Sequence, residues 1–227
     1  MFTLYTAIGT LRFKKEQSES PVPVIINDHQ EFGMSREELL LWSCLAFQIL
    51  TIHELTQMYE SRKPKDTPDT LPVSHYLNRL ILRGLIVKGE GISGVDALYR
   101  LLGELYIVSI EERFPVRLFS CVHLFLEGKI KVSDWGKVLR KPKCPPIEKT
   151  ILKLAQTVML STAELVTCID QGKDIYTNQD VLEVLYSDSE TTYKTLADDA
   201  QLNHTQYPVL QAIANLYLNK QISFQKF

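Results

Sequence analysis

The sequence predicts a mainly helical chain with a few short strands, arranged as two related helical modules. Apolar residues recur at helical spacing over residues 35–50 and through most of residues 147–219. Short runs with β-type composition lie within the first 33 residues and after Gly84. A segment around residue 80 also matches one around residue 216, at a constant offset. Together these patterns favour a tandem fold that is mainly α.

Length and composition exclude several classes of protein. A chain of 227 residues with 45% hydrophobic residues and a net charge of −2 can bury a substantial core as one large or two small domains. The longest apolar run, residues 39–47, is interrupted by Ser43 and is shorter than the roughly 18 residues that a membrane span needs. The start of the chain has no basic segment and no small-residue cleavage site. We therefore expect a cytoplasmic protein without membrane contact.

The cysteines follow no zinc-binding or dense disulfide spacing, so reduced thiols are expected. Cys44, Cys121 and Cys168 lie within apolar helical patterns and are interpreted as core residues. Cys144 lies between basic and proline residues, where an exposed thiol could be sensitive to oxidation.

Turn residues, prolines and changes of composition divide the chain into four segments. Residues 1–34 read as an N-terminal β hairpin or arm, and residues 35–112 as a first helix-turn-helix module with a β wing. Residues 113–146 read as a basic helical connector that ends at a proline cluster, and residues 147–227 as a second helix-turn-helix-like module.

Three helices are predicted in the first module. The first is capped by Ser35 and runs to about residue 50, and the second covers residues 51–61. A proline-rich turn over residues 63–72 leads to the third helix, which Ser74 caps and Gly84 ends. The strands expected at residues 85–87 and 105–110 would form the wing, with a short helix between them.

The third helix has one apolar side and one mixed side. Leu77, Leu80 and Ile81 share one side at helical spacing. The opposite side carries these residues: His75, Arg79, Leu82 and Arg83. Two arginines on the outer side of such a helix suggest contact with DNA.

The same helix pattern recurs 136 positions later. Leu77 falls on Ile213, Leu80 on Leu216 and Ile86 on Ile222. Chance matching of two amphipathic helices remains the alternative. The predicted outward side of the second helix is neutral and consists of Gln211, Asn215, Leu218 and Asn219. This side favours a second subunit or another protein as its partner, with Leu218 at the centre.

Charge is concentrated in the middle of the chain. Residues 129–153 contain eight Lys or Arg and two Asp or Glu, a balance of +6. Lys137, Arg140, Lys141 and Lys143 belong to this run. It is either a solvated linker or a segment that contacts phosphates.

Catalytic and cofactor motifs are few. Gly89-Glu90-Gly91-Ile92-Ser93-Gly94 satisfies G-x-G-x-x-G, and Glu111 follows at the distance of a ribose-binding acid. No series of further βαβ units follows, so flexible wing glycines are the preferred interpretation. The five histidines are scattered and no nucleophile or metal motif occurs. The sequence thus predicts no enzyme, no cofactor and no metal.

Residues 51–86, with Leu77, Leu80 and the Arg83-Gly84-Leu85-Ile86 ending, resemble the winged helix-turn-helix superfamily of bacterial transcription regulators. Such families place the third helix in the major groove and the wing against the backbone. The resemblance implies DNA contacts at the matching positions, which are Ser74, His75, Asn78, Arg79, Arg83 and Lys88.

Two functions from different classes follow. A homodimeric DNA-binding transcriptional regulator, in contact with double-stranded DNA, is favoured by Arg79, Arg83 and the basic run. An interaction or scaffold protein, whose winged helices bind protein or a second copy of the chain, is favoured by the near-neutral charge. A continuous basic surface would separate the two.

Overall fold

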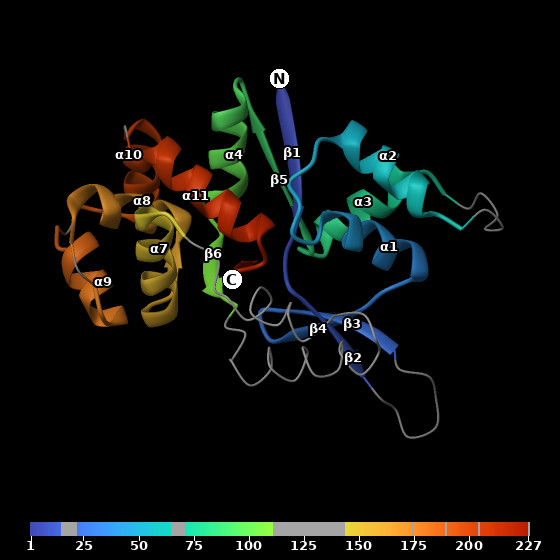
Figure 1. The fold of residues 1–227 in the computed structure, drawn as a ribbon, viewed down its shortest axis with the longest axis horizontal. Helices are drawn as coiled ribbons and strands as arrows, with labels where there is room; N and C mark the ends of the chain where they lie inside the picture. The colour runs from blue at the N-terminus through green and yellow to red at the C-terminus, as the bar shows by residue number, and fades with distance from the viewer. Residues whose placement is uncertain are drawn as a thin grey trace, which may run out of the picture.

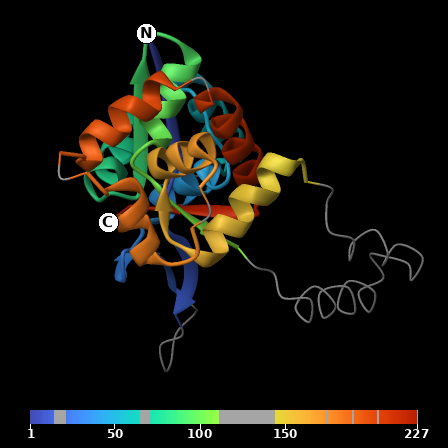
Figure 2. The ribbon, with the colours of Figure 1, turned by 90° about the vertical axis from the view of Figure 1, so that its left-hand side faces the viewer.

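The computed structural model describes residues 1–14, 22–64, 71–110, 144–173, 175–188, 190–203 and 205–226. The described part has two lobes side by side, with α4, β1 and β5 between them and a small sheet below (Figures 1 and 2). The first part of the chain forms β1 (Phe2–Ala7), β2 (Thr10–Lys14), β3 (Val22–Asn27), β4 (Gln30–Gly33), α1 (Arg36–Leu45), α2 (Ile52–Arg62), α3 (Val73–Leu82), β5 (Ile86–Gly91) and α4 (Gly94–Leu102). The second part forms β6 (Tyr106–Ser109), α7 (Pro146–Thr157), β7 (Leu160–Ser161), α8 (Thr162–Gln171), α9 (Asn178–Leu185), α10 (Tyr193–Leu202), α11 (Gln206–Leu218) and β8 (Ile222–Gln225). The predicted class, mainly α with small antiparallel sheets, is confirmed.

The strand pairing differs from the predicted wing. β5 pairs antiparallel with β1, with Ile86 opposite Ala7, and Leu50 bridges to Tyr5 on the other side of β1. β6 instead lies between β7 and β8 in a separate sheet. The expectation that the strands at 85–87 and 105–110 pair with each other is therefore wrong. The N-terminal strand takes the place that a returning wing strand would have.

The first 34 residues do not form one separate arm. β1 belongs to the sheet with β5, while β2, β3 and β4 form an antiparallel sheet of their own. This second sheet supports the end of α3, because the Asn27 amide donates to the Gly84 carbonyl at 3.4 Å and Arg83 donates to the Gly33 carbonyl. The predicted connector lies mostly outside the described residues, which resume at Cys144.

The two lobes repeat one order of elements: strand, helix, short strand or bridge, helix, third helix, strand. α3 and α11 end in the same way at the offset of 136 residues. The Leu85 amide donates to the Leu80 carbonyl, and the Gln221 amide donates to the Leu216 carbonyl, both at 2.9 Å. α9 and α10 are additional to this order in the second lobe, and β2, β3 and β4 are additional to it in the first.

The helix ends also depart locally from the sequence prediction. α1 ends at Leu45 rather than near residue 50, because Phe47 takes a left-handed conformation with φ 57° and Leu50 is drawn into the bridge with Tyr5. Ser74 does not cap α3, since Pro72 occupies the cap position without a side-chain hydrogen bond.

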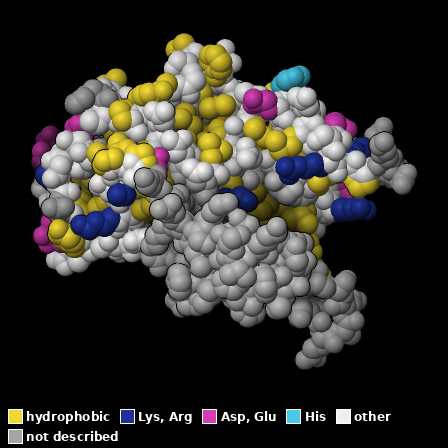
Figure 3. Space-filling model, in the orientation of Figure 1, with side chains coloured by type: hydrophobic (Ala, Val, Ile, Leu, Met, Phe, Trp, Pro, Cys, Tyr) yellow, Lys and Arg dark blue, Asp and Glu magenta, His cyan; other side chains and the backbone are white. Residues whose placement is uncertain are grey.

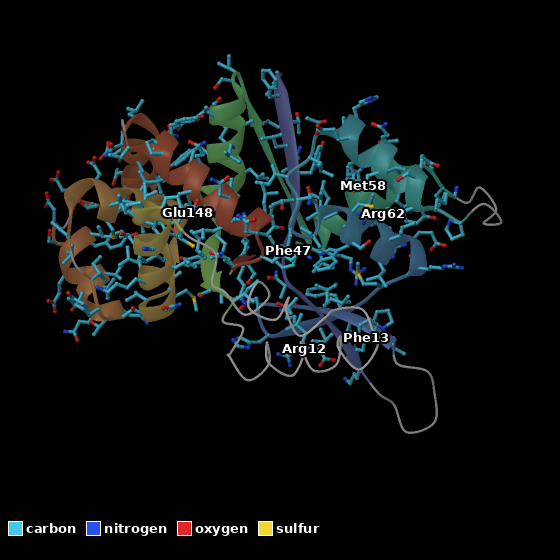
Figure 4. All side chains as sticks on the ribbon, in the orientation of Figure 1. Arg12, Phe13, Phe47, Met58, Arg62 and Glu148 are labelled. Carbon is cyan, nitrogen blue, oxygen red and sulfur yellow. The ribbon has the colours of Figure 1, made fainter. Side chains whose placement is uncertain are left out.

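The lobes are joined through a buried tyrosine of α11. The Tyr217 hydroxyl accepts hydrogen bonds from the Thr6 hydroxyl at 2.9 Å and the Phe47 amide at 3.0 Å, and donates to the Ala7 carbonyl at 3.1 Å. Phe47, labelled in Figure 4, stacks against the Tyr217 ring with centroids 5.4 Å apart. These contacts fix the second lobe against the first. No helix among the described residues is long and apolar enough to cross a membrane.

Candidate functional site on the third helices

α3 buries one side and presents the other to solvent. Tyr76, Leu77 and Leu80 are buried against the first lobe, while Ile81 is only half-buried. The sequence pattern did not include Tyr76 in the apolar side. The exposed side carries Ser74, His75, Asn78, Arg79 and Leu82. Leu82 is 87% exposed, so it projects almost fully from this surface.

The two arginines of α3 both contact one buried carboxylate on α1. Glu38 is 1% exposed, and its Oε2 lies 3.2 Å from Arg83 Nη1 while its Oε1 lies 3.2 Å from Arg79 Nε. The Arg83 contact is a hydrogen bond. The Arg79 contact is an ion pair whose N–H is not aimed at the oxygen, since Oε1 accepts no hydrogen bond. A buried carboxylate needs such cations, because leaving its charge unpaired is costly.

Local sequence explains why Glu38 lies there. Ser35 and Glu38 form a reciprocal capping box, in which the Ser35 amide donates to Glu38 Oε2 at 2.9 Å. This box holds the carboxylate at the start of α1, beside the end of α3. The Ser-x-x-Glu pattern was the signal for the position of Glu38. Its pairing with α3, about 40 residues away, had no local signal.

Arg83 is turned inward, in contrast to its predicted place on the outer side. Its side chain is 25% exposed, its Nη2 donates to the Gly33 carbonyl, and its guanidinium carbon lies 5.6 Å from the centre of the Phe32 ring. Arg79 is 52% exposed and remains on the open side. Arg83 therefore joins α1, α3 and β4, and only Arg79 keeps a largely open charge.

The remaining predicted DNA contacts are dispersed. Lys88 lies on β5 and forms an exposed ion pair with Glu90 at 2.9 Å, and the hydrogen bond to that carboxylate raises the Lys88 pKa. Lys137, Arg140, Lys141 and Lys143 lie outside the described residues. On the face in Figure 3, the described Lys and Arg side chains form separate small groups around a central area of hydrophobic side chains. The described residues on this face thus form no continuous basic surface.

α11 presents the predicted neutral side. Gln211, Asn215, Leu218 and Asn219 are all exposed, and Val209, Ile213, Leu216 and Tyr217 are buried. Leu218 is 45% exposed at the position that matches Leu82.

A counterpart of the Glu38 pair occurs in the second lobe. Glu148 on α7 is 7% exposed, and Asn215 donates from Nδ2 to its Oε1 at 3.4 Å. Figure 4 shows Glu148 between α7 and α11. Asn215 matches Arg79 at the offset of 136, so an amide stands where the first lobe has a guanidinium. The outward side of α11 consequently carries no charge at its four predicted positions.

The G-x-G-x-x-G segment has a packing role, and its interpretation as a flexible wing is wrong. Gly89 and Gly91 lie in β5 directly against α4, where a methyl group would collide with backbone atoms of Ala97 and Leu101. Asp96 occupies the start of α4, since its carboxylate accepts from the Ile92 amide and from Arg100 Nε, both at 2.9 Å. These hydrogen bonds, that from Arg100 foremost, lower the Asp96 pKa. A protein carboxylate therefore holds the place that a bound phosphate would need.

The described cysteines differ in burial. Cys44 and Cys168 are buried, and burial raises the pKa of the Cys168 thiol to about 12. Cys144 is half-buried rather than exposed, with Sγ 3.6 Å from Gln221 Oε1. Cys121 lies outside the described residues.

Comparison with known proteins finds no relative of this chain. No family model, curated protein or solved structure matches the chain. The outward sides of α3 and α11 carry exposed residues that are mostly uncharged.

Proposed function

We propose that the chain is a tandem winged helix-turn-helix protein whose third helices bind protein. The order of elements in each lobe supports this, because a three-helix unit is followed by a strand in a small antiparallel sheet. In each lobe the middle strand comes from earlier in the chain, β1 in the first and β6 in the second.

One observation carries the choice of partner: the arginine pair of α3 is engaged by Glu38. A protein that binds duplex DNA gains most of its affinity from cations that neutralise phosphates. Arg83 is already used inside the first lobe, and Arg79 shares the same carboxylate. The matching side of α11 has no cation at its predicted positions. A side of this composition is better suited to a protein surface.

For α11 we propose a second copy of this chain as the partner. In a two-fold dimer the same patch meets itself, so like charges near the axis repel. The side around Leu218 is neutral and avoids this repulsion, whereas the side of α3 carries Arg79. Leu218 would lie at the centre of the contact.

Sedimentation velocity of the full chain tests this proposal directly. The unmodified chain is expected to dimerise at micromolar concentrations, and Leu218→Glu to sediment as a monomer. Leu82→Glu is the matched control, because it makes the same change at the matching position of α3 and should leave the dimer intact. An unmodified chain that stays monomeric up to about 100 μM would overturn self-association through α11.

Double-stranded DNA is the second candidate, on the observation that Ser74, His75, Asn78 and Arg79 share the exposed side of α3. Specific base contacts are worth about 1–3 kcal/mol each. If α3 reads DNA, Arg79→Ala should remove specific retention in a gel shift, while Lys141→Ala should weaken all duplexes alike. No retention of any duplex at low salt would exclude this candidate.

A further inference from the structure

A cleft of about 390 Å³ lies between β5, α4 and α10, away from the outward sides of the third helices. Its volume falls within the roughly 300–1,000 Å³ of typical ligand sites. Lys88, Gly89 and Glu90 of β5 form one wall, and Asp198 and Gln201 of α10 lie on the opposite wall. The floor is one side of α4 and the two residues that follow it, Gly103 and Glu104. The wall on β5 therefore consists of a strand rather than of loops.

The edge of β5 at this cleft has open backbone groups. Tyr5 pairs with Leu50 through its own amide and carbonyl, so these groups of Tyr5 point away from β5. Lys88 lies opposite Tyr5, and in an antiparallel pair the backbone groups of the two residues then point to opposite sides. The same holds for Glu90. β5 has β1 as its single strand neighbour among the described residues.

The second lobe shows the same edge with a segment of the chain against it. Phe224 of β8 matches Lys88 at the offset of 136, and its carbonyl accepts a hydrogen bond from the Gly9 amide at 3.4 Å. The matching carbonyl in the first lobe has no such partner among the described residues. An open strand edge is a template for pairing with another chain.

Two cations, Lys88 and Arg100, and three carboxylates line the cleft, and Arg100 is paired with Asp96 at 2.9 Å. Lys88 pairs with Glu90 at 2.9 Å, and Glu104 on the floor pairs with Lys226 at 2.7 Å. The carboxylate of Asp198 is exposed and forms no ion pair or hydrogen bond with the described residues. Its charge acts on the Tyr99 hydroxyl, whose pKa is raised by burial first and then by Tyr193 and Asp198. An occupant with a positive side chain opposite Asp198 would neutralise this carboxylate.

We propose that the cleft binds an extended peptide of a partner protein, which adds as a strand to the open edge of β5 and places a lysine or arginine against Asp198. Backbone hydrogen bonds to Lys88 and Glu90 would supply affinity, and the basic side chain would supply selectivity. This site is separate from the α11 contact and does not depend on it.

The test uses random dodecapeptides displayed on phage and selected on the immobilised full chain. Selected peptides are expected to be rich in Lys or Arg, and synthetic copies are then measured by fluorescence anisotropy. Asp198→Lys should weaken them at least about tenfold, because like charges then face each other. Asp199→Lys is the matched control on the same helix, and its affinity should stay within about twofold.

A second pair of variants tests the strand addition. Lys88→Pro removes the outward amide without breaking the pairing with β1, since proline is tolerated on the open side of an edge strand. It should abolish binding, whereas Lys88→Thr keeps the amide and should bind within a few fold of the unmodified chain. Bound peptide should also slow amide exchange at Lys88 and Glu90.

Three outcomes would overturn the proposal. They are a selection that enriches no peptide, equal binding by Lys88→Pro and Lys88→Thr, and binding that leaves exchange at Lys88 and Glu90 unchanged. Leu218→Glu should bind the same peptides as the unmodified chain, because the two sites are separate. An unmodified chain that binds the peptides but stays monomeric would refute self-association through α11 and leave this site standing.

Discussion

Replacement of Arg83 by alanine should destabilise the fold although Arg83 lies at the end of a surface helix. The change removes the hydrogen bond to Glu38 at 3.2 Å, the bond to the Gly33 carbonyl and the contact with Phe32. It also leaves the buried Glu38 carboxylate with the Ser35 amide and with the charge of Arg79, which is more exposed and makes no hydrogen bond to it. Because Arg83 is 25% exposed, the expected loss is about 2 kcal/mol, below the ~3–5 kcal/mol for breaking a fully buried pair.

Arg79 supplies the matched comparison on the same helix. Its side chain is 52% exposed and its N–H is not aimed at Glu38, so Arg79→Ala should cost about 0–1 kcal/mol. Urea denaturation followed by far-ultraviolet circular dichroism measures both losses. A double-mutant cycle with Glu38→Gln should give a coupling of about 1 kcal/mol or more for Arg83.

The opposite order would refute this reasoning. If Arg83→Ala stays within about 0.5 kcal/mol of the unmodified chain and shows no coupling to Glu38→Gln, the ion pair does not stabilise the first lobe. Arg83 would then be free to contact a partner, and the main argument against DNA would fall.

Three further predictions concern packing and burial. Gly89→Ala should lower the free energy of unfolding by about 1–3 kcal/mol or more in urea denaturation, because α4 must move away from β5. At Gly94 an added methyl group meets nothing within 4 Å, so Gly94→Ala should be neutral or stabilising. Equal effects of the two substitutions would contradict the close packing of Gly89. Tyr217→Phe should cost about 1–3 kcal/mol, since it leaves buried polar groups of the first lobe without their partner, and an unchanged unfolding midpoint would argue against this link. In the folded chain Cys168, with a pKa of about 12, should react with iodoacetamide far more slowly than Cys144, as measured by peptide mass spectrometry; rapid labelling of Cys168 would contradict its burial.

The elements that local signals specify were predictable from the sequence. The end of α3 at Gly84 follows from a left-handed glycine after an amphipathic helix, and the structure gives Gly84 a φ of 65°. The exposed side of α11 follows from its helical spacing. The sequence pattern did not include Tyr76, which lies beside Leu77 on the buried side of the helix.

The features that depend on distant contacts could not be predicted from one sequence. The partner of β5 is the N-terminal strand, and no local pattern distinguishes that strand from the nearer one at residues 106–109. The inward turn of Arg83 depends on Glu38 and Gly33, which precede it by about 50 residues. Helical spacing predicts on which side of the helix a side chain starts. An arginine side chain is long enough to reach from the outer side of the helix to a buried carboxylate.

A photo-crosslinking amino acid at position 218, in the full chain produced in its own cells, tests most directly whether the third helices meet protein. After irradiation, we expect an adduct that proteases degrade and nucleases do not, with a covalent dimer of this chain as its main component. The same crosslinker at Gln156, which is exposed on α7, should give no dimer. An adduct at position 218 that nucleases degrade, or no adduct at all, would contradict the account.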